Sequence, residues 1–363
     1  MKIATIIGAR PQFIKAALLS ERIRKDKSGD KKITEILINT GQHYDYNMSK
    51  MFFEELNIPK PDYNLNVRAG PYASQMAKMM QGIEAIVKKE KPDAILVYGD
   101  TNSTLAGSLV AVMLNIPLYH IEAGLRSYDK SMPEEINRLI ADNLSTLLFC
   151  PTDRAVKNLR KENIRKGVYL VGDIMYELAM KTEKAASKES DILRRFKIRP
   201  KKYILATVHR QASTDIKSNL RSIVKAFCRM RNVVVFPVHP RTQKMLKKFG
   251  LWKLLKKSKN VKIIPPIGYI DMICIEKNAS KIITDSGGVQ KEAYFFKVPC
   301  ITLRDNTEWA ETLHGGWNSV VGTGADKIVK AVQRDVKEKP WLNYYGTGRT
   351  SGQILNILKK MKA

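Results

Sequence analysis

The segment TDSGGVQKEAYFF, from Thr284 to Phe296, follows an apolar run and opens into a stretch with helical character. Two glycines at a strand-to-helix junction are common wherever the backbone turns sharply. The same glycines would let a phosphate approach the N–H groups at the helix start, where the helix dipole favours anions. The segment therefore predicts either a tight turn or a phosphate-binding site.

A pair of cations stands near the start of the chain. In GARPQFIK, Arg10 lies in a loop after the first predicted strand, and Lys15 follows about one helical turn later. Both side chains could reach a diphosphate at the helix start, although a surface arginine and lysine would look the same. Their place beside the Gly8 turn favours the functional interpretation.

Acidic side chains follow several apolar strands. Asp100 ends the strand of VYGDTNST and could equally be the N-cap of the next helix. Glu122 follows IPLYHI, while Glu134 and Glu135 stand behind Pro133, where compensation of a helix dipole would explain them without chemistry. Three carboxylate positions aimed at one region could serve as acid and base on two faces of a substrate.

In the second half of the chain, histidine and arginine also follow predicted strands. His209 and His239 each follow a predicted strand. His209 could hold phosphate, assist a proton transfer, or be a satisfied histidine at the core edge. Arg304, after the strand VPCITL, could close a phosphate site, with Glu292 contacting a ribose hydroxyl.

Ligands of parallel sheets bind beyond the carboxyl ends of the strands. Six predicted strand ends carry glycine, acid, histidine or arginine, which predicts an active cleft between the two halves of the chain. His43 follows another strand and is expected near this cleft, whereas His120 lies within a strand and is expected to be structural. The sequence contains no GxSxG, HExxH or GxGxxG motif, so neither a bound metal nor a nicotinamide cofactor is predicted.

These residues must be positioned by elements that alternate along the whole chain. Short β-branched runs separated by helical stretches are typical of doubly wound parallel sheets covered on both faces. The polar segment Thr182 to Lys202 lacks strand character and separates two such halves. The predicted strands are KIATIIG, TEILINT, DAILVYGD, IPLYHIEA and TLLFCP, then YILATVH, VVVFPVH, VKIIPP, KIITDS, VPCITL and SVVG.

Length and composition set the frame. At 363 residues the chain can form two domains with full cores, and no apolar stretch approaches the roughly 18 to 20 residues of a membrane helix. The N-terminal run reads as a buried strand rather than a secretory signal. Four scattered cysteines indicate reduced thiols in a cytoplasmic protein, without a zinc site: Cys150, Cys228, Cys274 and Cys300.

The formal net charge of +28 is unusual and could signal nucleic-acid binding. The lysines, however, interleave with helical apolar positions, and neither zinc-finger spacing nor an RNP-like aromatic motif is present. Solvated helix faces are the favoured explanation, with a basic cleft for a polyanionic small molecule as a second contributor. No nucleic-acid or membrane partner is expected.

The motifs GARPQFIKA, TGQH, GDTNSTLAG, HIEAGLRS, PEEINR, VHPR, TDSGGVQKEA and LRDNTEW occur in order along nearly the whole chain. In this the chain resembles the non-hydrolysing UDP-N-acetylglucosamine 2-epimerases. The resemblance implies an α/β fold of two Rossmann-like domains in the glycosyltransferase B arrangement, and a homodimer. It implies a first domain over 1–170, completed by a C-terminal helix over 347–363, and a UDP-binding domain over 171–346.

The resemblance also implies a reaction without a cofactor, in which C2 loses a proton while UDP leaves C1 and both then add back. Matched residues for proton transfer are Asp100, Glu122, Glu134 and His209. Those for UDP binding are Arg10, Lys15, Arg138, His239, Ser286, Gly287, Gly288, Glu292 and Arg304. Gln42, His43, Arg126 and Lys130 would support the site from behind.

Details such as TGQHYDYNMS, GLRSYDKSMPEEINR and EWAETLHGGWN look similar to the branch acting on UDP-2,3-diacetamido-2,3-dideoxy-glucuronate. That substrate carries a carboxylate, for which Lys130 and Arg126 are the nearest candidate cations. One departure is HRQAST, where the family usually has Glu at the position of Ala212 or Ser213. Plain UDP-N-acetylglucosamine as substrate, a glycosyltransferase on the same fold, and a nucleic-acid-binding protein are the alternatives.

Overall fold

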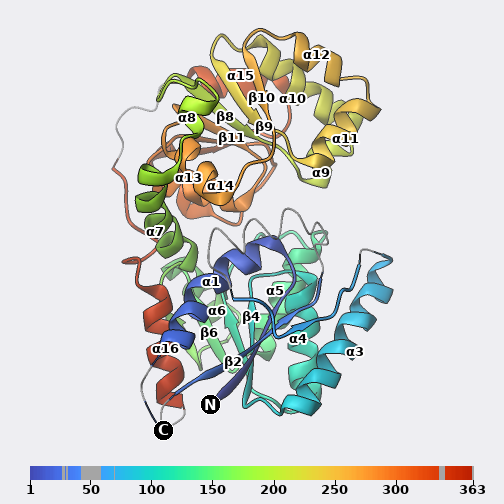
Figure 1. The fold of residues 1–363 in the computed structure, drawn as a ribbon, viewed down its shortest axis with the longest axis vertical. Helices are drawn as coiled ribbons and strands as arrows, with labels where there is room; N and C mark the ends of the chain where they lie inside the picture. Colours follow the sequence, from blue (N-terminus) through green and yellow to red (C-terminus); the bar gives the residue numbers. More distant parts are fainter. Residues whose placement is uncertain (27–28, 30–31, 42–58, 69, 335–339, 362–363) are drawn as a thin grey trace. The chain divides into compact units, whose positions relative to one another are not determined.

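The computed structural model describes residues 1–361 except 27–28, 30–31, 42–58, 69 and 335–339. The chain divides into two compact units, which are described separately (Figure 1). Unit 1 comprises Met1–Leu178 and Asn343–Ala363, and unit 2 comprises Ala179–Leu342. Helix α7, Ile174–Glu189, carries the chain from one unit into the other.

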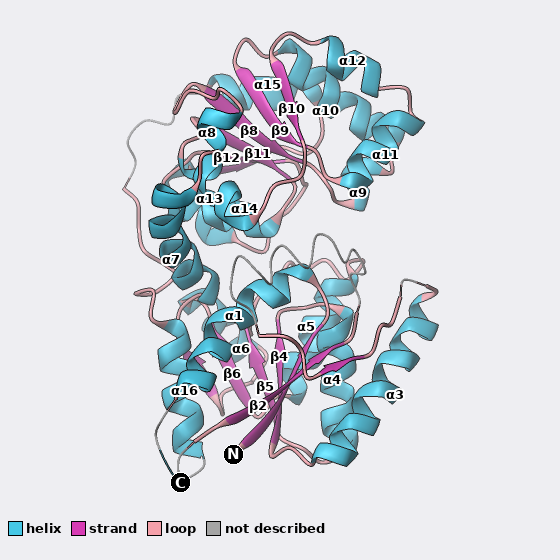
Figure 2. Cartoon of the chain, in the orientation of Figure 1, coloured by secondary structure: helices cyan, strands magenta, loops and turns pink. Residues whose placement is uncertain are grey.

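Unit 1 is built on a seven-stranded sheet in the order β3-β2-β1-β4-β5-β6-β7, and neighbouring strands pair in parallel. Central strands β4 and β5 are buried at every position, because helices cover both faces of the sheet (Figure 2). The elements are β1 Lys2–Ile7, α1 Arg10–Lys25, β2 Thr34–Asn39, β3 Tyr63–Asn64, α3 Tyr72–Glu90, β4 Ala94–Tyr98, α4 Asn102–Met113, β5 Leu118–Ile121, α5 Pro133–Leu144, β6 Leu147–Cys150, α6 Asp153–Lys161, β7 Val168–Leu170 and α16 Thr350–Met361.

Unit 2 repeats the plan with a six-stranded parallel sheet in the order β10-β9-β8-β11-β12-β13. Its elements are α8 Ile192–Arg195, β8 Tyr203–Thr207, α9 Gln211–Thr214, α10 Lys217–Arg229, β9 Val233–Pro237, α11 Pro240–Lys248, α12 Trp252–Lys257, β10 Val261–Ile264, α13 Tyr269–Lys277, β11 Lys281–Thr284, α14 Gly287–Phe295, β12 Cys300–Thr302, the 3₁₀ segment η2 Ala310–Gly316, β13 Asn318–Val320 and α15 Ala325–Gln333. One apolar core joins α10, α11, α12 and α15 to this sheet.

The C-terminal helix α16 packs against α1 of unit 1. Arg22 Nε donates to Ser351 Oγ at 2.5 Å, and Lys359 Nζ pairs with Asp26 at 2.7 Å. The carboxylate of Glu177 accepts from the Ser351 N–H at 2.7 Å, which fixes the start of the helix. Helix α16 is thus part of the same unit as α1.

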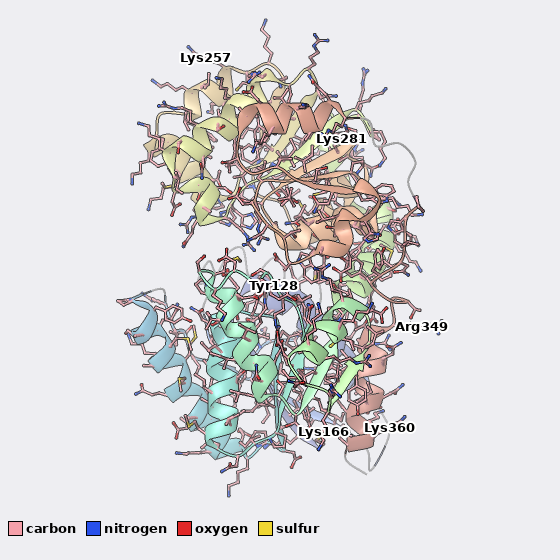
Figure 3. All side chains as sticks on the ribbon, turned by 180° about the vertical axis from the view of Figure 1, so that it is seen from behind. Tyr128, Lys166, Lys257, Lys281, Arg349 and Lys360 are labelled. Carbon is pink, nitrogen blue, oxygen red and sulfur yellow. The ribbon has the colours of Figure 1, made fainter. Side chains whose placement is uncertain are left out.

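The structure confirms the predicted fold class of two doubly wound parallel sheets, and every predicted strand is present. Two strands escaped prediction, β3 and β7, because each is a short strand at the edge of the sheet. Basic side chains such as Lys257 and Lys360 lie on outer helix faces, as the charge pattern predicted (Figure 3). The predicted domain ranges stay a prediction.

Candidate active site

In unit 1 the turns that follow β1, β4 and β5 meet at one edge of the sheet, because these strands are neighbours and parallel. Glu122 takes φ +71°, a left-handed conformation that non-glycine residues adopt rarely. Backbone of this kind recurs at functional sites, where the surrounding structure enforces it. The edge carrying Glu122 is therefore the first candidate for chemistry.

Lys15 of α1 reaches across to this edge and binds Glu122, with 2.7 Å between Nζ and Oε1. The two side chains are 11% and 6% exposed, so the ion pair is largely desolvated. Gly99 makes room for it, since a Cβ there would lie 3.0 Å from Lys15 Nζ. At the start of α1, Gly8 and Ala9 donate their N–H groups to the Gln12 side chain.

Helix α5 also contacts the turn after β4. Arg138 binds the carboxylate of Asp100 and, at 2.8 Å, that of Glu135. Asn137 donates to the Asp100 carbonyl at 2.9 Å. Thr101, not Asp100, is the N-cap of α4, so the N-cap alternative for Asp100 is wrong.

The two acids at the start of α5 differ in what they contact. Glu135 is buried and accepts from the N–H groups of Ser127 and Tyr128, each at 2.9 Å. It therefore shapes the loop after β5, whose Tyr128 is labelled in Figure 3. Glu134 is half-buried; together with burial, which contributes more, its charge raises the pKa of Tyr72.

A buried network of four ionisable side chains lies next to these turns. Asp142 of α5 binds His120 of β5 at 2.8 Å and Arg126 at 2.6 Å, and Arg126 also binds Glu162 at 2.5 Å. Burial alone would raise the pKa of Asp142, but hydrogen bonds and charges from His120 and Arg126 outweigh it and lower the pKa. The guanidinium of Arg126 is 1% exposed and clamps two carboxylates.

In unit 2 the turns after β8 and β11 are joined by Asp285. Its carboxylate, fully buried, accepts from the N–H groups of His209 and Arg210, both at 2.9 Å. The imidazole of His209 lies 5.5 Å from that of His239, which caps α11 by accepting from the Arg241 N–H at 3.2 Å. Sequence reasoning missed Asp285, although the signal was an acid directly after a strand in TDSGG.

Helix α14 begins with the Ser-Gly-Gly turn. Ser286 is the N-cap and the first turn itself carries no acidic residue, although the Glu308 carboxylate lies beside Gly287. A Cβ on Gly287 would lie 2.8 Å from Glu308 Oε1, whereas the nearest atom to a Cβ on Gly288 is Ser286 Oγ at 3.8 Å. The second glycine is thus the less crowded of the two, which suits the approach of an anion to the helix start.

The remaining predicted residues of unit 2 are buried and paired. Arg304 binds Glu308 at 2.8 Å, with both side chains 8% exposed. Glu292 accepts from the Tyr269 hydroxyl at 2.8 Å. Lys291 is 2% exposed and lies 3.9 Å from the centre of the Trp309 ring, a cation that the sequence analysis did not single out.

For three predicted residues the structure describes no side chain. Arg10 begins α1, while Gln42 and His43 lie outside the described residues. Lys130 is exposed in the loop after β5. Within the described residues no group of His, Cys, Asp and Glu could hold a metal ion, no helix is long and apolar enough to span a membrane, and the four cysteines are free thiols.

Two doubly wound parallel sheets with charged strand ends define an α/β protein of the glycosyltransferase B fold type. A family model described as UDP-N-acetylglucosamine 2-epimerase matches residues 25–359, and the chain belongs to this family of non-hydrolysing UDP-sugar 2-epimerases, isomerases acting on carbohydrates. The predicted family and enzyme class are therefore confirmed.

Known relatives cover almost the whole chain. It is 51% identical to a UDP-N-acetylglucosamine 2-epimerase homolog of Methanococcus maripaludis, over 99% of this chain and 100% of the relative. It is 44% identical to the UDP-2,3-diacetamido-2,3-dideoxy-D-glucuronate 2-epimerase of Pseudomonas aeruginosa, over 99% and 100%. The crystal structure of Methanocaldococcus jannaschii UDP-GlcNAc 2-epimerase in complex with UDP-GlcNAc and UDP is similar with a TM-score of 0.92 and 43% identity, over 99% and 100%.

Proposed function

We propose that the protein inverts C2 of a UDP-2-acetamido sugar by eliminating UDP and adding it back. The observation that carries the proposal is the pair of carboxylates, Asp100 and Glu122, on adjacent strand-end turns, each held by a buried or half-buried cation contact within unit 1. Carboxylates held in this way keep a fixed geometry, which general acid–base catalysis demands.

The reaction balances without a cofactor. A base removes the proton from C2, the electron pair forms the C1–C2 double bond, and the C1–O bond breaks so that UDP leaves with its electrons. An acid then protonates C2 on the opposite face of the resulting glycal, while a diphosphate oxygen of UDP attacks C1. Proton transfer is assigned to Asp100, Glu122, Glu134 and His209, and the order in which they act stays open.

The leaving diphosphate needs positive charge and N–H donors, because negative charge grows on it as the C1–O bond breaks. We assign it to the start of α14, where Ser286, Gly287 and Gly288 precede a first turn without acids. Arg10, Lys15, Arg138, His239 and Arg304 complete the proposed UDP site, with Glu292 on the ribose. The homodimer stays part of the proposal.

We propose the diacetamido-glucuronate as the sugar, because the loop and helix motifs around Lys130 match that branch. A uronate carboxylate without a cationic partner would face a desolvation penalty of several kcal/mol. Arg126 is unsuited to this role, since Asp142 and Glu162 occupy its guanidinium. The exposed Lys130 is therefore the assigned cation.

The test is incubation with each UDP-sugar in deuterated water, followed by NMR at C2 and competing-substrate kinetics. We expect deuterium at C2 and a preference for the uronate of about tenfold in kcat/KM, worth roughly 1.4 kcal/mol. Lys130→Ala should erase the preference and leave UDP affinity nearly intact. UDP-N-acetylglucosamine turned over as fast or faster would overturn the uronate assignment, and absence of C2 exchange with both sugars would overturn the epimerase proposal.

A further inference from the structure

His120 is a buried imidazole that the proposed proton transfers do not use. It lies in β5 with 0% of its surface exposed. Its Nδ1 is 2.8 Å from Asp142 Oδ1, and its Nε2 is 2.8 Å from the carbonyl oxygen of Gly99. The ring protons are assigned from these partners, and because a backbone carbonyl can only accept, Nε2 must carry a proton.

Whether Nδ1 of His120 carries a proton depends on the charge of Asp142. Its carboxylate is 0% exposed and also accepts from Arg126 Nη1 at 2.6 Å and from the Gly124 N–H at 3.1 Å. Leaving the imidazole aside, the Arg126 guanidinium and the Gly124 N–H both hold the carboxylate in its ionised form. An ionised carboxylate has no proton to donate, so Nδ1 must carry one as well.

We infer that His120 is a lasting imidazolium that positions the Gly99–Asp100 turn of the proposed active site. This inference rests on the proposed function for its catalytic consequence only. One N–H holds the Gly99 carbonyl and the other holds Asp142 of α5, the helix whose Asn137 and Arg138 contact Asp100. Three side chains of α5 therefore hold the turn: Asn137 and Arg138 directly, and Asp142 through His120. His120 contacts the turn only at the Gly99 carbonyl, so it is a positioning residue.

The charges around His120 balance. Two cations, His120 and Arg126, face two anions, Asp142 and Glu162. The Cys150 thiol of β6 stays neutral, because burial first and the Asp142 charge second raise its pKa. Other charged groups on the surrounding elements are the Lys15–Glu122 pair beside Gly99 and Asp100 with Arg138 and Glu135. Loss of either ring proton would set a nitrogen lone pair against an oxygen acceptor, at a buried site.

The protonation state can be read by NMR of the whole protein labelled with ¹⁵N-histidine, with His120→Gln identifying the signal. We expect both ring nitrogens of His120 to carry a proton in the folded protein, because each faces an oxygen acceptor. In Asp142→Asn the new amide can donate to Nδ1, so His120 should become a neutral, singly protonated ring. Asp215→Asn, which breaks a surface pair with Arg241, is the matched control and should change nothing.

The positioning role is read from kinetics of C2 exchange. A Gln at 120 can donate to only one of the two acceptors, so we expect kcat to fall tenfold or more while UDP affinity stays within twofold. Wild-type kcat should show no histidine limb from this residue between pH 6 and 9, whereas Asp142→Asn should acquire one. An unchanged kcat in His120→Gln overturns the positioning role.

The NMR measurement of His120 does not require the enzyme to be active. A His120 signal that titrates near pH 6.5, or that shows a single protonated nitrogen, overturns the inference even in an active enzyme. Wild-type protein without C2 exchange overturns the proposed function instead, while a doubly protonated His120 in the same sample upholds the imidazolium.

Discussion

Units 1 and 2 share one sheet plan but build their strand ends from different chemistry. In unit 1, side chains bind side chains: Lys15 holds Glu122, Arg138 holds Asp100 and Glu135, and the His120–Asp142–Arg126 network lies behind them. The acid that joins two strand-end turns of unit 2 is held differently: Asp285 accepts from two main-chain N–H groups, although Arg304 and Glu308 form a side-chain ion pair in this unit too.

The starts of helices α5 and α14 show the same contrast. The first turn of α5 carries Glu134 and Glu135, which compensate the helix dipole internally. The first turn of α14 carries two glycines and no acid, so its dipole is available to an external anion. This contrast is the reason for the proposed division, in which unit 1 moves protons and unit 2 holds the diphosphate.

The largest effect is expected from Asp100→Asn. The amide keeps the size of the side chain and an oxygen for Arg138 but cannot take a proton. Losing a positioned acid or base costs about 10²- to 10⁴-fold, so we expect C2 exchange to fall by that factor. UDP affinity, measured by calorimetry, should stay within about threefold, because neutralising a carboxylate removes no contact to UDP.

Asp129→Asn is the matched control for Asp100→Asn. It neutralises an acid in the loop after β5, where Asp129 accepts from Ser131. Exchange should be unaffected by it. Equal loss in both variants, or a fall in UDP affinity as large as the fall in exchange, would mean that Asp100 has no special place in the chemistry.

The next largest effect is expected from Lys15→Met. Removing one partner of a buried ion pair costs about 3 to 5 kcal/mol, because the other charge is left desolvated. The double variant Lys15→Met/Glu122→Gln should recover most of this loss in chemical denaturation. If Lys15 also contacts the diphosphate, as proposed, the free energy of UDP binding should weaken as well, by about 1.5 to 3 kcal/mol.

Lys25→Met provides the comparison on the same helix. Lys25 forms an exposed pair with Glu21, with the lysine side chain 76% exposed, and such pairs contribute less than about 1 kcal/mol. A loss of stability in Lys15→Met no greater than that in Lys25→Met would contradict the buried-pair account.

Much of this contrast was readable from the sequence. Apolar runs ending in Asp100, Glu122 or Ser286 predicted both the sheets and the edge where polar residues gather, because parallel strands place their carboxyl ends together. The sequence does not predict which side chains contact each other at this edge. Lys15 and Glu122 are 107 residues apart, and only the pairing of β4 with β5 and of β1 with β4 brings them into contact.

Asp285 and His120 show why local patterns fall short. Both were visible as residues at or within a strand, yet their roles depend on backbone groups of other strands: Asp285 on His209 and Arg210, His120 on Gly99. A sequence pattern gives the position of a side chain on its own element. It does not give the donors and acceptors that tertiary packing places beside it.

A smaller effect tests the role of unit 2. Gly288→Ala adds a methyl group where the nearest atom is 3.8 Å away, so the fold should hold. The methyl group would occupy the space that a phosphate needs above the helix start, and we expect UDP affinity to fall about tenfold, or 1.4 kcal/mol. Thermal unfolding and calorimetry on the same samples separate these two quantities.

Two other glycines of unit 2 sharpen the result. Gly287→Ala would place its Cβ 2.8 Å from Glu308 Oε1, so it should lower stability as well as UDP affinity. Gly324→Ala, at the start of α15, meets nothing closer than 3.8 Å and should change neither. UDP binding unaltered in Gly288→Ala would remove the diphosphate from the start of α14.

The smallest effect is expected at Glu35. It tests whether buried acids are stabilised as anions throughout unit 1 or only at the carboxyl ends of its strands. Glu35 lies in β2, and Thr5 donates to its Oε1 at 2.7 Å. Burial raises the pKa of Glu35, although the hydrogen bond from Thr5, the nearby Ser20 hydroxyl and the charge of Arg24 oppose it. Unlike Asp142, this acid is held at a cost when ionised.

The sign of the pH dependence follows from that direction. A carboxyl whose folded pKa exceeds its unfolded value, about 4.5 for glutamate, binds its proton more tightly in the native state. The free energy of unfolding therefore falls as pH rises from about 4.5 through the folded pKa, and the full penalty remains above it. Glu35→Gln removes the charge and offers an amide to Ser20, so it should raise the melting temperature at pH 7 and lose that advantage below about pH 4.5. A variant that is less stable than wild type at pH 7 would show that Glu35, like the strand-end acids, is stabilised as an anion, and the contrast within unit 1 would disappear.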